Sequence, residues 1–313
     1  MLLGWILVGA TLTCAQAGTF QLEILLSEDA PAYHELANTL QAELGIACAR
    51  SCTNTPNVRV TVVDDWRADA PRDLLVTLGN GAALQAARLR APAVLYGLIP
   101  ESTWQVLRRL RGHPGGTASA VFIDQPLARQ FRLLDLALPE KRRIGVLLGP
   151  ESARHEGALQ DLARSHGITL QVMHVTTPSQ VGPAIRMLSE QIDALLAVPD
   201  PLVFNRDTLY GILLTSYNAG VPVVGYSEAL VTAGAMLGIY TSVADMGRQL
   251  ALYSADYIIR PEALPPAGPS RYFEIAINHN VARSLGFQLP EAATLRQLLD
   301  ETGGSDETAQ TAK

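Results

Sequence analysis

Short apolar runs of strand length alternate along most of this chain with stretches whose apolar residues recur at helical spacing. Several runs are apolar almost throughout, which is typical of strands buried on both faces of a parallel sheet. The alternation predicts right-handed βαβ units and a doubly wound α/β fold. The predicted strands are 20–27, 58–63, 73–79, 92–99, 119–123, 143–149, 170–175, 194–200, 222–227, 236–241 and 272–278. The predicted helices are 31–44, 81–89, 101–111, 125–137, 152–166, 179–190, 203–218 and 243–259.

So many strands are too many for one open sheet of this class, and they favour two α/β lobes. The strongest breaks in the pattern are RGHPGGT at 111–117 and the Pro-rich RPEALPPAGPSR at 260–271. No low-complexity tether separates the lobes, so we expect short hinge crossings between two doubly wound parallel-sheet lobes. The polar tail at 303–313 is expected to be disordered.

Composition excludes several classes of function. Apolar residues make up 48% of the chain and charged residues 17%, which is enough apolar material for a substantial core. The net charge is -6 and no basic stripe is present, so nucleic acid is not an expected partner. The six histidines are scattered, and no nucleophile elbow, P-loop or paired-carboxylate motif is found. We therefore expect no metal, no cofactor and no enzymatic activity.

The first residues have the pattern of an export signal. Leu2 to Leu12 is an apolar segment of signal-peptide length, and Ala15-Gln16-Ala17 resembles a cleavage site. We expect residues 1–17 to be removed and the protein to be periplasmic or otherwise exported. A lipid anchor at Cys14 is the alternative.

Two cysteines follow the expected cleavage site, Cys48 and Cys52. An even pair in an exported protein predicts a disulfide. Two unpaired thiols in a reducing compartment are the alternative.

The expected ligand site follows from the position of polar residues at strand ends. In doubly wound sheets, strand carboxyl ends and helix amino ends meet at one edge, where ligands bind. Capping of the following helix is the structural alternative for Asn80, Ser152, Asp200 and Ser227. The candidate ligand-binding residues are Ser27, Gly79, Asn80, Gly81, Ser152, Asp200, Tyr226, Ser227 and Glu228.

Several segments after Gly18 resemble the elements of one known family. KRRIGVLLGPES (141–152) is similar to its K-R-I-G-V-L-Y-N-P-S segment, and MGRQ (246–249) to its L-G-R-Q helix. DLLVTLGNGAALQAA (73–87), VPVVGYSEALVTAGAM (221–236) and FEIAIN (273–278) also resemble family elements. On these motifs, most of the chain resembles the ABC-transporter substrate-binding proteins of the tryptophan/tyrosine-type lipoprotein group.

The resemblance implies a type I periplasmic-binding-protein fold, in which two lobes close around one small ligand. It implies an N-terminal lobe from residues 18–117 plus about 242–262. The C-terminal lobe would comprise 118–241 plus about 268–302.

The sequence departs from the family where a strand end reads G-A-L-A-x-Y-G-x-D-Y. The first tyrosine of that pattern falls on Ile239, the aspartate on Ser242 and the last tyrosine on Val243. The family's Asp-Asn-Thr becomes Asp200-Pro201-Leu202. The resemblance therefore does not carry over the identity of the ligand.

The expected function is an exported solute-binding protein of an ABC-type importer. It would act as a monomer, binding a small polar organic ligand and an inner-membrane permease. The alternative is a sensing or accessory subunit of the same fold that works with a membrane receptor or kinase. An α/β enzyme that uses the space between the lobes is the third hypothesis.

Overall fold

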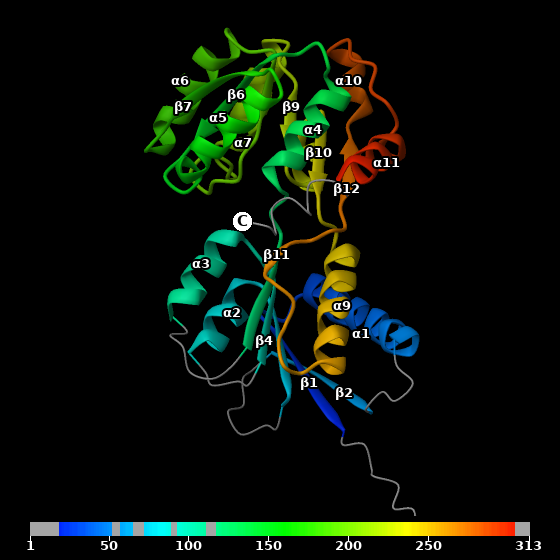
Figure 1. Ribbon diagram of the computed structural model, residues 1–313. Coiled ribbons are helices and arrows are strands. Elements are labelled where there is room, and N and C mark those ends of the chain that lie inside the picture. The colour runs from blue at the N-terminus through cyan, green and yellow to red at the C-terminus, as the bar shows by residue number, and fades with distance from the viewer. Residues whose placement is uncertain (1–18, 52–56, 65–71, 89–92, 111–116, 304–313) are drawn as a thin grey trace, which may run out of the picture.

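The computed structural model describes residues 19–51, 57–64, 72–88, 93–110 and 117–303. Its strands form two six-stranded sheets, which lie in the two lobes of Figure 1. Their strand orders are β11-β5-β4-β3-β1-β2 and β12-β10-β9-β8-β6-β7. All the pairings are parallel except that of β12 with β10. The prediction of two doubly wound, mostly parallel lobes is confirmed.

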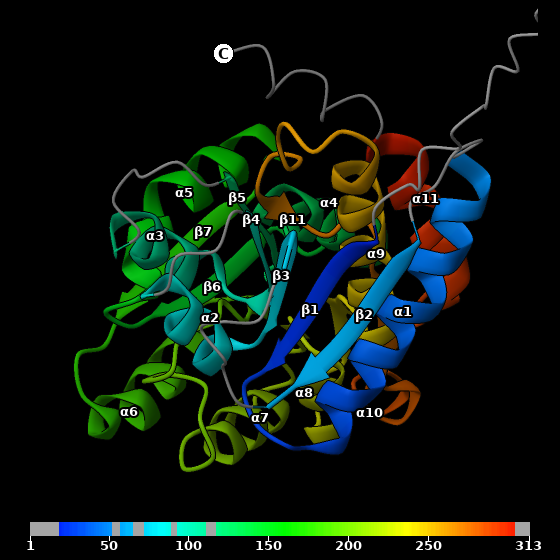
Figure 2. The same cartoon turned by 90° about the horizontal axis from the view of Figure 1, so that it is seen from below.

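The first lobe contains the first sheet and the helices on its two faces (Figures 1 and 2). Its strands are β1 (Phe20–Leu26), β2 (Val58–Val63), β3 (Leu74–Leu78), β4 (Ala93–Ile99), β5 (Thr117–Phe122) and β11 (Gly268–Pro269). Its helices are α1 (Pro31–Ser51), α2 (Asn80–Ala87), α3 (Glu101–Leu110) and α9 (Val243–Ile259).

The second lobe repeats this plan with a different set of segments. Its strands are β6 (Arg143–Leu148), β7 (Thr169–His174), β8 (Ala194–Leu196), β9 (Val223–Gly225), β10 (Leu237–Tyr240) and β12 (Glu274–Ile277). Its helices are α4 (Leu127–Ala137), the 3-10 turn η1 (Ser152–His155), α5 (Glu156–Ser165), α6 (Pro178–Ser189), α7 (Leu209–Asn218), α8 (Glu228–Ala233), α10 (His279–Ser284) and α11 (Ala292–Gly303).

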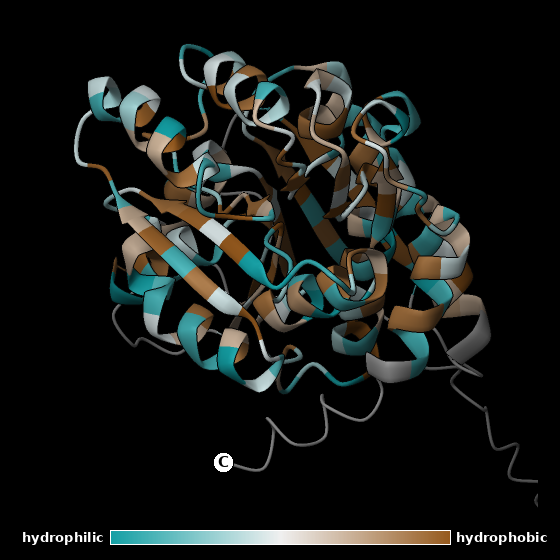
Figure 3. Cartoon of the chain, turned by 90° about the horizontal axis from the view of Figure 1, so that it is seen from above, coloured by the Kyte–Doolittle hydropathy of each residue, from teal (hydrophilic) through white to brown (hydrophobic). Residues whose placement is uncertain are grey.

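Each sheet is buried on both faces, as its apolar strands require. Figure 3 shows mostly brown strands in the interior and teal concentrated on the surrounding helices and loops. In the first lobe, Ile24 packs on the face covered by α1 and α9, and Leu25 on the opposite face with α2 and α3. None of the four core clusters of the described residues contains side chains from both lobes.

Three segments cross between the lobes, at 123–126, 241–242 and 270–273. They are linked to one another, because Gln125 Nε2 donates to Thr241 Oγ1 at 2.6 Å and Thr241 Oγ1 donates to the carbonyl of Tyr272 at 3.4 Å. The first crossing comes after β5, which pairs with β4. The lobe boundary expected at 117 therefore lies six residues further on, and β11 adds residues 268–269 to the first lobe.

The structure contains every strand that the sequence predicts, and it adds elements that the apolar pattern did not indicate. These are the two-residue strand β11 and the helices α8, α10 and α11. Helix α7 begins at Leu209, not at 203, because residues 200–208 form turns held by Asp200 and Asn205.

The predictions for the first 17 residues, for Cys52 and for the tail from 304 concern parts of the chain outside the described residues. Cys48 lies buried on α1, and its disulfide stays a prediction. Within the described ranges, no helix has both the length and the apolar character needed to cross a bilayer.

Candidate ligand-binding site

The candidate site is built on two rims, one at the strand carboxyl ends of each sheet. On the first rim, Ser27 follows β1 and organises the start of α2. Its hydroxyl donates to the carbonyl of Leu78 at 2.7 Å and accepts from the backbone N–H of Ala82 at 2.9 Å. Ser27 therefore caps α2 from the neighbouring strand end, a role that the sequence suggested for Asn80.

Gly79 makes this close approach possible. Its φ is 89°, in the left-handed region, and a Cβ there would lie 2.6 Å from Ser27 Oγ and 2.7 Å from the Tyr33 hydroxyl. A Cβ on Gly81 would be 3.3 Å from Ser27 Cβ. The two glycines thus let α1, β1 and α2 meet at one point of the rim.

Next along the first rim, two hydrogen bonds join the segments that follow β3, β4 and β5. Asn80 is exposed, and its Oδ1 accepts from Thr103 Oγ1 at 3.0 Å. Asp124 accepts the N–H of Glu101 at 2.6 Å, which fixes the first turn of α3. Burial raises the pKa of Asp124, and the carboxylate of Glu101 adds to that increase.

On the second rim, Asp200 and Ser152 form a buried network. Asp200 is 3% exposed and Ser152 is fully buried. Asp200 Oδ2 accepts from the N–H of Glu151 at 3.0 Å and from the N–H and Oγ of Ser152 at 2.9 Å each, while Oδ1 accepts from the N–H of Leu202 at 2.9 Å. The carboxylate thus occupies the start of η1, where an anionic ligand group could otherwise bind. This geometry supports the capping alternative for both residues.

Tyr226 and Phe204 form an aromatic pair beside this network. Their ring centroids are 5.8 Å apart at an interplanar angle of 82°. Burial, and then the charge of Asp200, raise the pKa of Tyr226 to about 12, so it stays a neutral hydroxyl at physiological pH. The pair offers an aromatic edge at the ends of β8 and β9.

The remaining two predicted residues lie at the start of α8. Ser227 caps this helix, because its Oγ accepts from the N–H of Leu230 at 3.2 Å. Glu228 is exposed, and its charge helps to raise the pKa of Tyr240 at the end of β10, after the larger effect of burial.

Ionisable groups of the two lobes face each other. Arg154 and His155 lie in η1 of the second lobe, and Arg154 Nε donates to His155 Nε2 at 3.1 Å. The pKa of His155 is lowered by burial first and then by Arg154, whereas Glu101 and Asp124 of the first lobe act in the opposite direction. Arg154 likewise lowers the pKa of Asp124.

Sequence reasoning missed these four facing residues. Glu101 and Asp124 follow β4 and β5, so the strand-end rule that selected the other candidates also covers them. His155 is one of the six scattered histidines, and only the three-dimensional arrangement shows its first-lobe neighbours.

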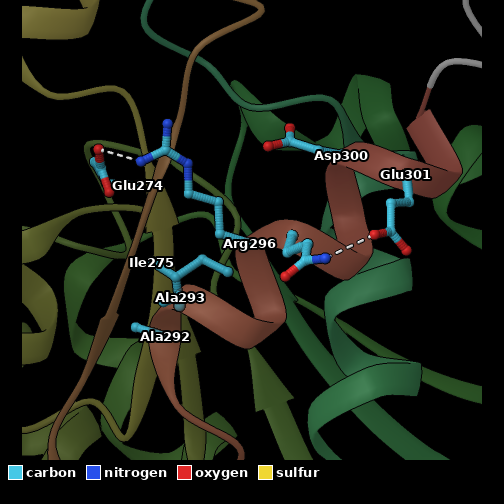
Figure 4. Close-up of a pocket in the computed structure, with 8 residues that line it drawn as sticks. Glu274, Ile275, Ala292, Ala293, Arg296, Asp300 and Glu301 are labelled. Carbon is cyan, nitrogen blue, oxygen red and sulfur yellow. Dashed lines mark hydrogen bonds and ion pairs between the residues drawn. The ribbon is translucent and has the colours of Figure 1, made fainter.

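Elsewhere, a groove of about 400 Å³ lies on the outer side of the second lobe, between β12 and α11 (Figure 4). Across the described ranges, no three His, Cys, Asp or Glu side chains are grouped to hold a metal ion.

Two α/β lobes with facing rims and three linked crossings define the class of two-lobed binding proteins. The profile of the ABC transporter substrate binding protein family matches residues 51–297. The chain belongs to this family, as its motifs indicated.

Solved structures agree on the fold, a type I periplasmic-binding-protein fold. A conserved domain protein from Vibrio cholerae is 20% identical, with a TM-score of 0.58, over 88% of this chain and 98% of that one. A ligand-free, open substrate-binding protein with adhesive properties from Clostridium difficile is 18% identical, with a TM-score of 0.67, over 87% and 96%. An ABC domain from Streptococcus pneumoniae in complex with L-Trp is 18% identical, with a TM-score of 0.56, over 88% and 97%. No curated protein matches the chain.

Proposed function

We propose that the chain is the exported solute-binding protein of an ABC-type importer and closes its two lobes on a small polar organic ligand. One observation carries the proposal: the strand carboxyl ends of the two sheets form rims that face each other across three linked crossings. Ligand contacts that form only when both rims meet would favour the closed form by their differential affinity.

The proposed contacts divide into two groups. The first group is accessible at the rims and can contact a ligand directly. It comprises the exposed Asn80, Gly81 and Glu228, the half-buried Tyr226 and, as an exposed cation, Arg154. The other predicted residues support the rims from below. These are Ser27, Gly79, Ser152, Asp200 and Ser227.

Thermal unfolding with a panel of solutes tests the proposal. The structural relative in complex with L-Trp makes amino acids the first solutes to test, followed by nucleosides and osmolytes. We expect one chemical class to raise the melting temperature and to reduce the radius of gyration in X-ray scattering. A folded protein that no solute stabilises would count against ligand binding.

Paired variants then locate the site. Arg154→Gln should weaken binding of the stabilising solute at least tenfold. Arg164→Gln is the matched control, because Arg164 lies on α5 and pairs with Asp161 on the helix surface. Equal affinities for the two variants would place the ligand away from the rims.

A sensing or accessory subunit is the second candidate, favoured by Ile239, Ser242 and Val243, where the family pattern has Tyr, Asp and Tyr. Ser242 caps α9 here, since its Oγ accepts from the N–H of Asp245 at 3.1 Å. Crosslinking of the purified protein in its own membranes distinguishes the two candidates. A crosslink to a permease supports the importer, and a crosslink to a receptor or kinase supports the sensor.

The mass of the purified mature protein tests the predicted cleavage after Ala17 and the lipid anchor at Cys14.

A further inference from the structure

Helix α3 presents an apolar face that no other part of the described chain covers. Val106 and Leu110 are four residues apart, so they share one face of the helix, and they are 45% and 57% exposed. Leu84 of α2, which is 40% exposed, extends this face. The hydrogen bond from Thr103 Oγ1 to Asn80 Oδ1 joins the two helices, and Leu84 and Val106 each lie about one turn further along their own helix.

Three arginines lie on or next to the same two helices, since Arg88 follows α2 and Arg108 and Arg109 are in the last turn of α3. Arg88, Arg108 and Arg109 are exposed, and no carboxylate among the described residues lies within ion-pair distance of them. We call Leu84, Arg88, Val106, Arg108, Arg109 and Leu110 the basic patch. It is a local excess of positive charge on a chain whose net charge is -6.

The groove on the second lobe has the complementary character. Its floor is apolar, with Ile275, Ala292 and Ala293. Its rim carries Glu274, Asp300 and Glu301 against one cation, Arg296, and the 2.9 Å pair of Arg296 with Glu274 leaves the carboxylates in excess (Figure 4). A groove of about 400 Å³ has room for side chains of the size of Leu110.

We propose that the basic patch of one molecule docks in the acidic groove of a second copy of this chain. Apolar side chains lie near charges of opposite sign on the two surfaces, which is the pattern that orients and stabilises protein contacts. Figures 1 and 2 both place α3 and α11 on opposite sides of the molecule, so each copy uses its patch with one neighbour and its groove with another. The contact is therefore head to tail and builds oligomers larger than the dimer, as closed rings or open chains. The surfaces are small, which makes the association weak and reversible.

Sedimentation velocity over a wide concentration range tests the proposal. The average sedimentation coefficient should rise with concentration without a plateau at the dimer, and salt should reverse the rise. The variant R108E/R109E and the variant D300K/E301K should each stay monomeric, because each brings like charges together. An equimolar mixture of the two variants should associate again, because the reversed patch of one fits the reversed groove of the other.

The control is R186E/R283E, which makes the same change in charge as R108E/R109E at two exposed arginines on α6 and α10. It should associate like the unaltered chain. A monomer at every concentration, or two patch and groove variants that stay apart when mixed, would overturn the proposal. Association that appears only after removal of residues 304–313 would also overturn it, because the chain's own tail would then be the occupant of the groove.

Discussion

At the scale of single residues, the backbone at Gly79 is the most demanding position on the first rim. Gly79→Ala would place a Cβ against Ser27 and Tyr33 and force a left-handed φ on an alanine. We expect the free energy of unfolding to fall by roughly 1 to 3 kcal/mol, measured by urea denaturation. Gly211→Ala is the matched control, because Gly211 lies in α7 with open space at its Cβ. That control should be neutral or stabilising by up to about 1 kcal/mol.

Asp200→Asn tests whether this carboxylate supports the fold or contacts the ligand. The variant loses charge-assisted bonds to three backbone N–H groups, so unfolding should become easier by roughly 2 to 4 kcal/mol. Asp161→Asn, on the exposed side of α5, should stay within about 0.5 kcal/mol of the unaltered chain. Unchanged stability combined with lost solute binding would make Asp200 a ligand contact instead.

His155 gives the protein a pH dependence whose sign follows from its lowered pKa. Its neutral form is favoured in the folded state, so the unfolded chain binds the proton more readily. The stabilisation is therefore present above the ordinary pKa of about 6.5 and is lost as the pH falls through the lower folded value. Melting temperatures across this range should fall less steeply for His155→Gln than for the control His279→Gln, which changes an exposed histidine on α10.

At the scale of elements, the hinge crossings depend on one another through side-chain hydrogen bonds. Thr241→Val keeps the shape of the side chain but leaves Gln125 Nε2 without its 2.6 Å acceptor. Urea denaturation should show a loss of about 1 to 2 kcal/mol. Thr169→Val, at an exposed position in β7, is the control. An equal loss of stability in the control would show that the loss in Thr241→Val does not come from the hydrogen bond at the hinge.

The strands and most helices could be predicted because buried parallel strands leave an uninterrupted apolar signal. Helix α11 was not predicted because, of its side chains within 292–301, only Leu295 and Leu299 are buried, among many polar neighbours. The lobe boundary was displaced because residues 111–117 contain the strongest turn signal, whereas the pairing of β5 with β4 is a non-local fact.

The candidate site was predictable in position but only partly in role. The strand-end rule finds the rims, where Ser27 and Asp200 lie, and their contact with a ligand stays a prediction. It could not tell a side chain that faces the other lobe from one that caps a helix below it. That distinction depends on which carboxylate or hydroxyl accepts from a backbone N–H. The N–H groups of Ala82 and Ser152, which donate to Ser27 and Asp200, are 55 and 48 residues away from them in sequence.

At the scale of the whole molecule, the two lobes have separate cores joined by three thin crossings. We expect calorimetry to resolve two unfolding transitions in the absence of solute. Gly79→Ala should lower one of them and Asp200→Asn the other, since each residue lies in a different lobe. A solute that bridges the rims should bring the transitions together. A single transition that both variants shift alike would show that the lobes unfold as one unit.

The placement of α9 has a consequence for how the chain is made. This helix belongs to the first lobe, where Met246 and Leu250 pack in the same core as Leu36 and Leu40. It follows almost the entire second sheet in sequence, and β12 follows it in turn. Neither half can therefore finish its interior until the last part of the polypeptide has left the ribosome, so the growing chain should remain incompletely folded throughout most of its synthesis.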